Sequence, residues 1–447
     1  MNSPNIAFVP IARTTFDIEF AHQKTQAALA TLEKGPFHIV GSDELVTDPD
    51  GMDMVLSTLA DQPIDALLIF QATFADSSMV MKLAQAVDAP LFMWAVPEDH
   101  TGGRLRLNSL CGINLAGHAL TRAGISYRHL FTAPEDSRAL NEVIVLSRAG
   151  YARRILKGAR LGRVGENPEG FETCLVDPAK LTQRFGLEIV QLDLQVDIFD
   201  KVRKLETPAT QPILDQLSQQ VEGLDEMETG PVHGTLGTYK TLRDTASHAK
   251  LQGYAVRCWP EFFTELGCAA CGAMSMLSNE MIPCSCEADV NGTITQLMLQ
   301  SISGSQAFGT DMVSIDEERD AMVLWHCGLA PLSMADPEAE KRVTLHSNRK
   351  LPLLMDFPLK PGTVTIARLS EARGDYVLAV GEGEIIRAPK SFSGTSGLIR
   401  FAKPAHDFLD TLIRSGLEHH ISLTYGSYTK ELIALANLLE LPIIELT

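Results

Sequence analysis

Short apolar runs alternate with amphipathic segments along the first third of the chain. Residues 80–87 carry apolar side chains at the spacing of one helix face, and they follow Asp-Ser-Ser, which are good capping residues. The apolar runs are IAFVPI (6–11), FHIVG (37–41), ALLIF (66–70) and LFMWAV (91–96). Strand–helix–strand alternation of this kind predicts a parallel α/β sheet, whose ligands gather beyond the carboxyl ends of the strands.

The middle of the chain repeats this alternation, and the last third departs from it. A helix expected over about 139–158 leads to a strand, LEIVQLDL (187–194), and to a helix over 239–253. From about residue 295, short β-rich runs such as GTVTIARL and HISLTYG are separated by glycine and proline. We therefore expect two Rossmann-like α/β domains and a β-rich C-terminal domain resembling an antiparallel barrel. The expected domains are 1–158, 159–280 and 281–447.

Charge and length exclude several classes of partner. The chain has 447 residues and a formal net charge of −18. Binding to nucleic acid or to an anionic membrane needs a basic face, so neither is expected as a partner. The N-terminus has no signal-peptide pattern, and no stretch approaches the roughly 18 apolar residues of a membrane span. We expect a cytoplasmic protein with reduced thiols.

Four cysteines lie within nineteen residues: Cys268, Cys271, Cys284 and Cys286. This number is close to that of a zinc ribbon. Two of them, however, lie in the apolar segment FFTELGCAACGAMSML, which we expect to be a helix in which cysteine packs as a small hydrophobic residue. Core packing is favoured over a structural zinc site.

Acids and histidines offer a different kind of site. Glu261 follows the strand-like AVRCW and a proline, and Asp289 lies in CEADVNG. A carboxylate among Trp, Pro, Phe and Cys is costly to bury unless it is paired or metal-bound, although a helix cap or an ion pair is the simpler explanation for each. His326 and the His419-His420 doublet lie at the margins of β-rich runs. Two carboxylates with a histidine suit a hard cation such as Mn²⁺ or Mg²⁺.

A string of motifs then resembles a known family. In order, the segments are ARTTFD, GGRLRLNSLCGINLAGHAL, RCWPEF, CEADVNG, WHCGLAP, FSGTSG and HHISLTYG. They are similar to the L-fucose isomerase and L-arabinose isomerase superfamily, and more closely to its shorter, fucose-isomerase-like branch. The resemblance implies two α/β domains with a β-rich C-terminal domain, and interconversion of aldoses and ketoses. It also implies a divalent cofactor, usually Mn²⁺ with Mg²⁺ or Co²⁺ as alternatives, and assembly as a homotrimer or homohexamer.

The resemblance assigns roles to particular residues. It implies that Glu261, Asp289 and His420 bind the metal, with His419 as the alternative histidine. Isomerisation would pass through a cis-enediol, and Glu261 or Asp289 would move the proton between C1 and C2. Non-catalytic sugar binding or regulation is the alternative function, and it would require an incomplete metal site.

The sugar itself is less constrained. The chain is shorter than the longer fucose isomerases, and such proteins act on other monosaccharides, including C6-modified ones such as sulfoquinovose. Arg13, Arg104 and Arg106 could bind an anionic C6 group or could form surface ion pairs. The resemblance also implies that the loop with Arg13 reaches a neighbouring subunit's active site. The full set of expected substrate contacts is Arg13, Thr15, Trp94, Arg104, Asn108, Trp259, Asn291, His326 and His419, with core packing as the alternative for both tryptophans.

Overall fold

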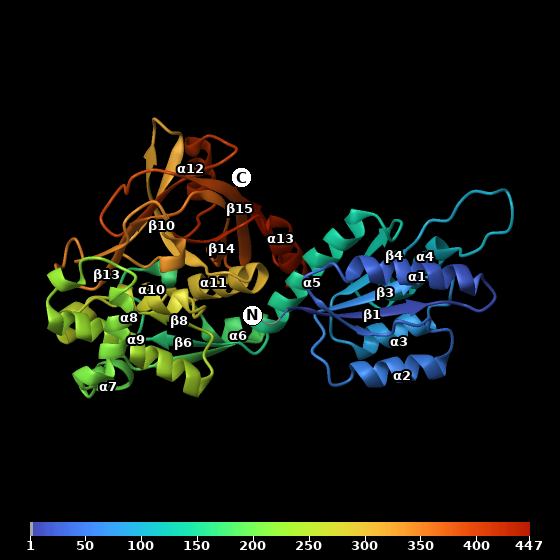
Figure 1. Ribbon diagram of the computed structural model, residues 1–447, viewed down its shortest axis with the longest axis horizontal. Coiled ribbons are helices and arrows are strands. Elements are labelled where there is room, and N and C mark those ends of the chain that lie inside the picture. Colours follow the sequence, from blue (N-terminus) through green and yellow to red (C-terminus); the bar gives the residue numbers. More distant parts are fainter. Residues whose placement is uncertain (1–2) are drawn as a thin grey trace. The chain divides into compact units, whose positions relative to one another are not determined.

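The computed structural model describes residues 3–447, which form two compact units that meet in sequence at Arg154 and Ile155 (Figure 1). The second unit contains both a parallel sheet and a barrel. The boundaries expected at 158 and 280 remain predictions. No helix in the described part of the chain is long and apolar enough to cross a membrane.

The first unit is built on a five-stranded parallel sheet in the order β2-β1-β3-β4-β5. Its strands are β1 Asn5–Ile11, β2 His38–Gly41, β3 Ala66–Gln71, β4 Leu91–Ala95 and β5 Tyr127–Phe131. The first four agree with the predicted apolar runs to within one residue at each end. The parallel α/β prediction for this unit is confirmed.

Helices cover both faces of this sheet. They are α1 Ile18–Leu32, α2 Pro49–Leu59, α3 Ser78–Ala86, α4 Ser109–Arg122 and α5 Ser137–Leu156. Helices α2, α3 and α4 share one apolar core with alternate residues of β1, namely Ala7, Val9 and Ile11. Figure 1 shows α1 on the opposite side of the sheet from α2 and α3. The side chain of Asp17 caps α1 by accepting the Phe20 amide.

The second unit begins with a four-stranded parallel sheet in the order β7-β6-β8-β9. Its strands are β6 Arg160–Val164, β7 Glu188–Leu192, β8 Gly253–Val256 and β9 Cys284–Ser285. The accompanying helices are α6 Pro178–Phe185, α7 Asp200–Arg203, α8 Gln211–Ser218, α9 Thr229–Ala249, α10 Cys271–Asn279 and α11 Val290–Ser303.

Six antiparallel strands of the same unit close into a barrel. The order is β16-β11-β10-β17-β14-β15, and pairing of β15 with β16 completes the ring. The strands are β10 Phe308–Asp316, β11 Ala321–His326, β14 Gly362–Ser370, β15 Val377–Ile386, β16 Thr395–Arg400 and β17 His420–Tyr425. Strands β12 Arg342–Thr344, β13 Leu354–Pro358 and β18 Ile443–Glu445 extend the barrel, with helices α12 Ala405–Arg414 and α13 Thr429–Leu438. The predicted barrel-like domain is confirmed.

Helix α11 joins the parallel sheet to the barrel. It contacts β8 and β9 on one side and β10, β14 and β17 on the other. Its residues are buried on every face from Val290 to Ile302. A helix buried all round lacks an amphipathic period, which is why the change of pattern near residue 295 gave no sign of it. The β-rich region begins at Phe308 instead.

Two predicted helices differ from the observed ones. The helix expected over 239–253 begins ten residues earlier, at Thr229, and ends at Ala249. The segment from Phe262 to Leu277 is not one helix, because Gly267 adopts φ +74° and separates a short π-helical turn from α10. Cys268 lies in this break. Glycine adopts positive φ at little cost, so it ends the first turn.

Trp94 lies inside the first unit. Its side chain is 0% exposed, its Nε1 donates to the Thr132 carbonyl at 3.0 Å, and its ring meets Phe70 edge-on. A ring enclosed in this way offers no face to a ligand, so the expectation that Trp94 contacts the substrate is wrong. The core-packing alternative holds.

We expect Trp94→Phe to lower the stability of the first unit without changing substrate affinity. The variant loses the bond to Thr132 and leaves a buried carbonyl without a partner, which costs about 1–3 kcal/mol. Thermal unfolding and steady-state kinetics measure the two effects. A raised KM at unchanged stability would return Trp94 to the substrate site.

Candidate active site

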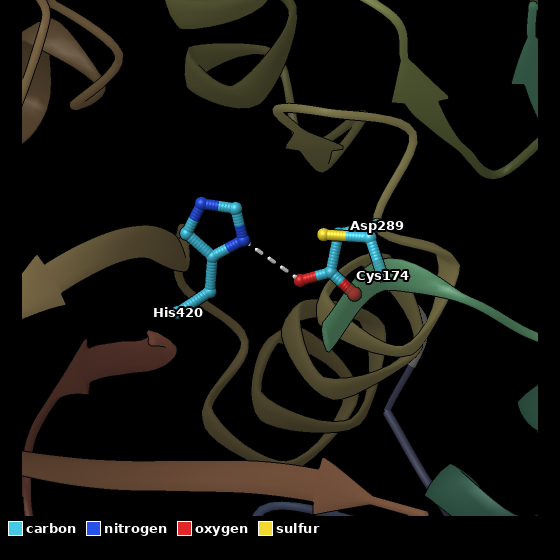
Figure 2. A group of neighbouring side chains, drawn as sticks. All are labelled: Cys174, Asp289 and His420. Carbon is cyan, nitrogen blue, oxygen red and sulfur yellow. Dashed lines mark hydrogen bonds and ion pairs between the residues drawn. The ribbon is translucent and has the colours of Figure 1, made fainter. Parts of the chain in front are cut away.

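Two distant segments meet at the centre of the site. Asp289 is the N-cap of α11, where its Oδ1 accepts the Gly292 amide at 2.9 Å. A side chain at position 292 would begin 2.5 Å from the Asp289 carboxylate, so only glycine leaves room for this cap. His420 opens β17, and its Nδ1 lies 3.0 Å from Asp289 Oδ2 (Figure 2). Asp289 and His420, predicted as ligands of one ion, are therefore neighbours.

Arg368 fixes the Asp289 carboxylate from the barrel side. Its Nη1 and Nη2 reach the two Asp289 oxygens at 2.5 and 3.1 Å, and its Nε reaches Glu418 at 3.2 Å. The arginine is 1% exposed and the aspartate 0%. Burial alone would raise the pKa of Asp289, but the charges of Arg368 and His420 hold that pKa well below its usual range. Asp289 is therefore an ionised, immobile carboxylate.

Glu287 brings a second carboxylate to the same place. Its Oε2 lies 3.1 Å from His419 Nε2 and 3.9 Å from His420 Nε2, and its Oε1 accepts the Trp259 indole N–H at 3.2 Å. Burial opposes ionisation of Glu287, yet the bond to His419 and the charge of His420 lower its pKa. Burial likewise opposes protonation of His419, while its bond to Glu287 raises its pKa.

The backbone at Glu287 is strained. Glu287 and Ala288 have φ of 58° and 55°, a left-handed region that costs non-glycine residues of the order of 1 kcal/mol each. Asn167 Nδ2 donates to both of their carbonyls, at 3.1 and 3.4 Å. The strained turn is thus held by a side chain from another segment. Such strain concentrates at functional sites.

Two further side chains complete what we call the histidine–carboxylate cluster, defined as Glu287, Asp289, Asp311, His326, His419 and His420. Asp311 pairs in register with His420 across β10 and β17, and its Oδ1 lies 3.5 Å from His420 Nε2. That oxygen is buried and has no hydrogen-bond partner among residues 3–447. The His326 ring stacks 5.9 Å from the His420 ring. A buried acceptor without a donor is a place where a cation or water is expected.

The donor set suits a divalent cation. Three groups of side chains each bring their ligand atoms within 4.8 Å of one another: Glu287 with His419 and His420, Asp311 with His326 and His420, and Cys174 with Asp289 and His420. Carboxylate oxygen with imidazole nitrogen is typical of Mn²⁺ and similar ions. The Cys174 thiol lies against Asp289 in Figure 2, and burial and the Asp289 charge raise its pKa. The raised pKa favours the neutral thiol when no cation is bound.

Glu261 lies at the edge of this cluster and not in it. Both of its oxygens accept from Arg257 Nε, at 3.0 and 2.8 Å, and this pairing lowers its pKa. Arg257 also donates to the Asn167 carbonyl at 3.0 Å, which connects Glu261 to the strained turn at Glu287. Its predicted metal-binding role stays a prediction.

The other predicted contacts divide between the two units. Trp259, His326 and His419 lie at the cluster, and Asn291, two residues beyond Asp289, is buried with an unpaired Oδ1. Arg13, Thr15, Arg104 and Asn108 belong to the first unit. Arg13 and Thr15 follow the carboxyl end of β1, and Asn108 precedes α4. Among the three arginines considered as anion-binding residues, Arg106 forms an ion pair with Asp17, with Nε 2.9 Å from Oδ2.

Three members of the site were not predicted: Glu287, Asp311 and Arg368. Each had a local signal. Glu287 stands two residues from Asp289 in CEADVNG, Arg368 is the one charged residue of β14, and Asp311 has only uncharged residues within four positions on either side in β10. A charge in such a strand indicates a partner, but the sequence does not show which one.

The clustered cysteines form no common metal site. Cys268, Cys271, Cys284 and Cys286 are all buried in the apolar core of the second unit. In the described part of the chain, none of them belongs to a group close enough to hold an ion. Cys271 instead lies 3.3 Å from Cys327, sulfur to sulfur. The zinc-stabilised alternative has no support.

Comparisons with known proteins identify the class. Residues 7–145 match the family described as fucose/sulfoquinovose isomerase, N-terminal domain, and residues 355–447 match the L-fucose isomerase C-terminal domain. Two relatives called sulfoquinovose isomerase, from Priestia aryabhattai and Priestia megaterium, are each 33% identical over 446 residues, covering 99% of both chains. A sulfoquinovose isomerase of Alkalicoccus urumqiensis is 32% identical over 445 residues with the same coverage.

The chain is therefore a sugar isomerase of the aldose–ketose type. It belongs to the fucose/sulfoquinovose isomerase family, as its motifs predicted. The alternative of a non-catalytic sugar-binding protein is set aside.

We expect Asp289→Asn to destabilise the second unit far more than Glu261→Gln. The first leaves a buried arginine partly unpaired, which costs about 3–5 kcal/mol. The second breaks a pair whose side chains are 21% and 25% exposed, worth about 0–1 kcal/mol. Thermal unfolding midpoints at neutral pH make the comparison. Equal midpoints would contradict the account of Asp289 as a buried anchor.

The pH dependence of the Asp289 effect has a definite sign. Folding lowers the pKa of Asp289, so its ionised form stabilises the fold above the unfolded value of about 3.9. That contribution is lost as the pH falls below this value. The stability difference between wild type and Asp289→Asn should therefore be constant above pH 5 and shrink below pH 4.

Proposed function

We propose that this isomerase converts sulfoquinovose, a C6-sulfonated aldose, to its ketose with the help of a divalent metal ion. The full-length similarity to three proteins called sulfoquinovose isomerase supports the substrate. The observation that carries the metal site is the convergence of Glu287, His419 and His420 within 4.8 Å, beside Asp289. Nucleic acid and membrane have no part in this proposal.

The proposed metal ligands are Asp289 and His420, which were predicted, and Glu287, which was not. Asp289 and Glu287 supply ionised carboxylates because the pKa of each is lowered. Glu261 stays the predicted further ligand, and it would have to exchange its bonds to Arg257 for the ion. When bound, Mn²⁺ (or Mg²⁺ or Co²⁺) would act as a Lewis acid that polarises the sugar carbonyl and favours negative charge on its oxygens.

Among the two predicted bases, the geometry favours Glu261 over Asp289. Both Asp289 oxygens are held by Arg368, and the residue is fully buried. Glu261 is a quarter exposed, and among the described residues its carboxylate forms no hydrogen bond or ion pair with a histidine, so it is free to approach a sugar carbon once it leaves Arg257. We propose that Glu261 moves the proton between C1 and C2 through a cis-enediol. A positioned base of this kind contributes about 10²–10⁴-fold to the rate.

Aromatic rings line the approach to the cluster. Phe171 meets Trp259 edge-on at 5.5 Å and His419 at 6.2 Å, centroid to centroid. Trp259 is half-buried and bonds Glu287 through Nε1. We propose that these rings exclude water from the sugar carbons that react, which strengthens electrostatic interactions inside the site.

The proposal includes a homotrimer or homohexamer in which the Arg13 loop completes a neighbour's site. The support is the family resemblance together with the place of Arg13 beyond β1, at the ligand-binding edge of its sheet. Sedimentation velocity measures this assembly. A fully active monomer would rule out shared sites.

We expect chelation to abolish turnover and Mn²⁺ to restore it. His420→Asn should bind Mn²⁺ at least about 100-fold more weakly, since loss of an inner ligand exceeds the 10–100-fold effect of an outer partner. His406→Asn is the matched control, because His406 is exposed and, within the described part of the chain, its ring bonds Glu317 alone. Metal content by mass spectrometry and Mn²⁺ titration report the result. Full activity in metal-free protein would contradict the metal site.

We expect Glu261→Gln to lose both turnover and exchange of the C2 hydrogen with solvent. In deuterium oxide, wild type should incorporate solvent deuterium at the carbon that receives the proton, and the variant should be at least about 10²-fold slower. Glu265→Gln, an exposed acid one turn away, is the control. Complete retention of the substrate hydrogen in wild type would favour a hydride shift, and a wild-type rate in the variant would remove Glu261 from the chemistry.

A further inference from the structure

One exposed cation beside the site has no acidic partner. Arg349 lies in the segment between β12 and β13, and its guanidinium carbon sits 5.1 Å from the centre of the Trp259 ring and 4.9 Å from that of Phe263. Within residues 3–447, no carboxylate lies at ion-pair distance from it.

The other arginines around the site are neutralised. Arg257 is bound by Glu261, and Arg163 by Glu166 at 2.7 Å. Arg368 is shared between Asp289 and Glu418. These guanidinium groups stabilise carboxylates of the protein itself. Of these four arginines, Arg349 alone has N–H donors that no carboxylate of the described residues binds.

The segment that carries Arg349 is ordered by its own bonds. The Lys350 amide donates to the His346 carbonyl at 2.7 Å, and the His346 amide donates to the Leu351 carbonyl at 2.9 Å. The amides of Asn348 and Arg349 point at His346 Nδ1, at 3.3 and 3.4 Å. The His346 ring in turn packs edge-on against Phe263. A cation stacked on aromatic rings in a closed turn is pre-organised for a ligand.

The separation from the cluster matches the length of a sugar. A single indole ring lies between Arg349 and Glu287, since Trp259 contacts the first through its face and the second through Nε1 at 3.2 Å. Because an indole ring is a few ångströms across, the Arg349 guanidinium carbon and the Glu287 carboxylate are separated by no more than about 10 Å. Five carbon–carbon bonds of about 1.5 Å place C6 of an open-chain hexose roughly 6 Å from C1, and a sulfonate reaches further.

We propose that Arg349 binds the C6 sulfonate of the substrate while C1 and C2 lie at the histidine–carboxylate cluster, an inference that rests on the proposed function. The planar guanidinium has paired N–H donors that match two sulfonate oxygens, and within residues 3–447 no carboxylate occupies those donors. Arg349 would thereby select the sulfonated sugar over its neutral counterpart. It takes no part in proton transfer.

The test compares two sugars that differ only at C6. For Arg349→Gln, kcat/KM on sulfoquinovose should fall about 10- to 100-fold, mainly through KM, because one charge-assisted pair is lost. Turnover of 6-deoxyglucose, which has a methyl group in place of the sulfomethyl group, should change less than threefold. Arg349→Lys should fall between wild type and Arg349→Gln. Lys350→Gln removes a neighbouring exposed charge and should change neither sugar's kcat/KM more than threefold.

A non-reacting ligand separates this inference from the proposed function. In wild type, 6-deoxy-6-sulfoglucitol should inhibit 6-deoxyglucose turnover, and Arg349→Gln should weaken that inhibition at least tenfold. One outcome is that wild type fails to isomerise sulfoquinovose while the sulfonated inhibitor still binds wild type at least tenfold more tightly than Arg349→Gln. In that case the proposed substrate fails and the anion site stands. Equal losses on both sugars, no loss on either, or unchanged inhibition in Arg349→Gln would overturn the inference.

Discussion

The buried pair of Arg368 and Asp289 determines how the site is assembled. Arg368 extends from the barrel to the cap of α11, and it also bonds Glu418, the residue before the two histidines, and the Thr173 carbonyl at 3.3 Å. Thr173 Oγ1 in turn lies 3.0 Å from His419 Nδ1. The Arg368 guanidinium therefore positions Asp289 directly, and it positions the histidines through Glu418 and Thr173. Burying these charges is costly, and only a full set of partners offsets that cost.

The site has a rigid part, Asp289 with His420, and a less constrained part, Glu287, His419 and Glu261. Asp289 is held by two donors of Arg368 and by the Gly292 amide, and it keeps His420 in place through Nδ1. A carboxylate bonded to a histidine nitrogen fixes the orientation of the imidazole ring. Glu287 and His419 are more exposed, and within residues 3–447 the Glu261 carboxylate is bound by Arg257 alone. The groups that must respond to a substrate are those with the fewest constraints.

Features that depend on neighbouring residues could be predicted from the sequence, whereas contacts between distant segments could not. Four of the five strands of the first unit were placed to within a residue because alternation of apolar runs is a local signal, whereas β5 was not predicted. Asp289 and His420 could be named from motifs. Their link to Arg368 could not, since 79 residues separate Arg368 from Asp289 and strand pairing decides the contact. Trp94 was assigned to the substrate site because the sequence of a strand does not show whether an aromatic ring near its carboxyl end faces a cleft or the core.

The location of the metal ion is the most direct test of this account. Crystals grown with Mn²⁺ and measured at the manganese absorption edge would show the ion by anomalous scattering. The account predicts one strong peak between the N-terminus of α11 and the start of β17, within bonding distance, about 2.1–2.3 Å, of His420 and of at least one carboxylate among Glu261, Glu287 and Asp289. A peak elsewhere, or none in an active Mn²⁺-loaded crystal, would contradict it.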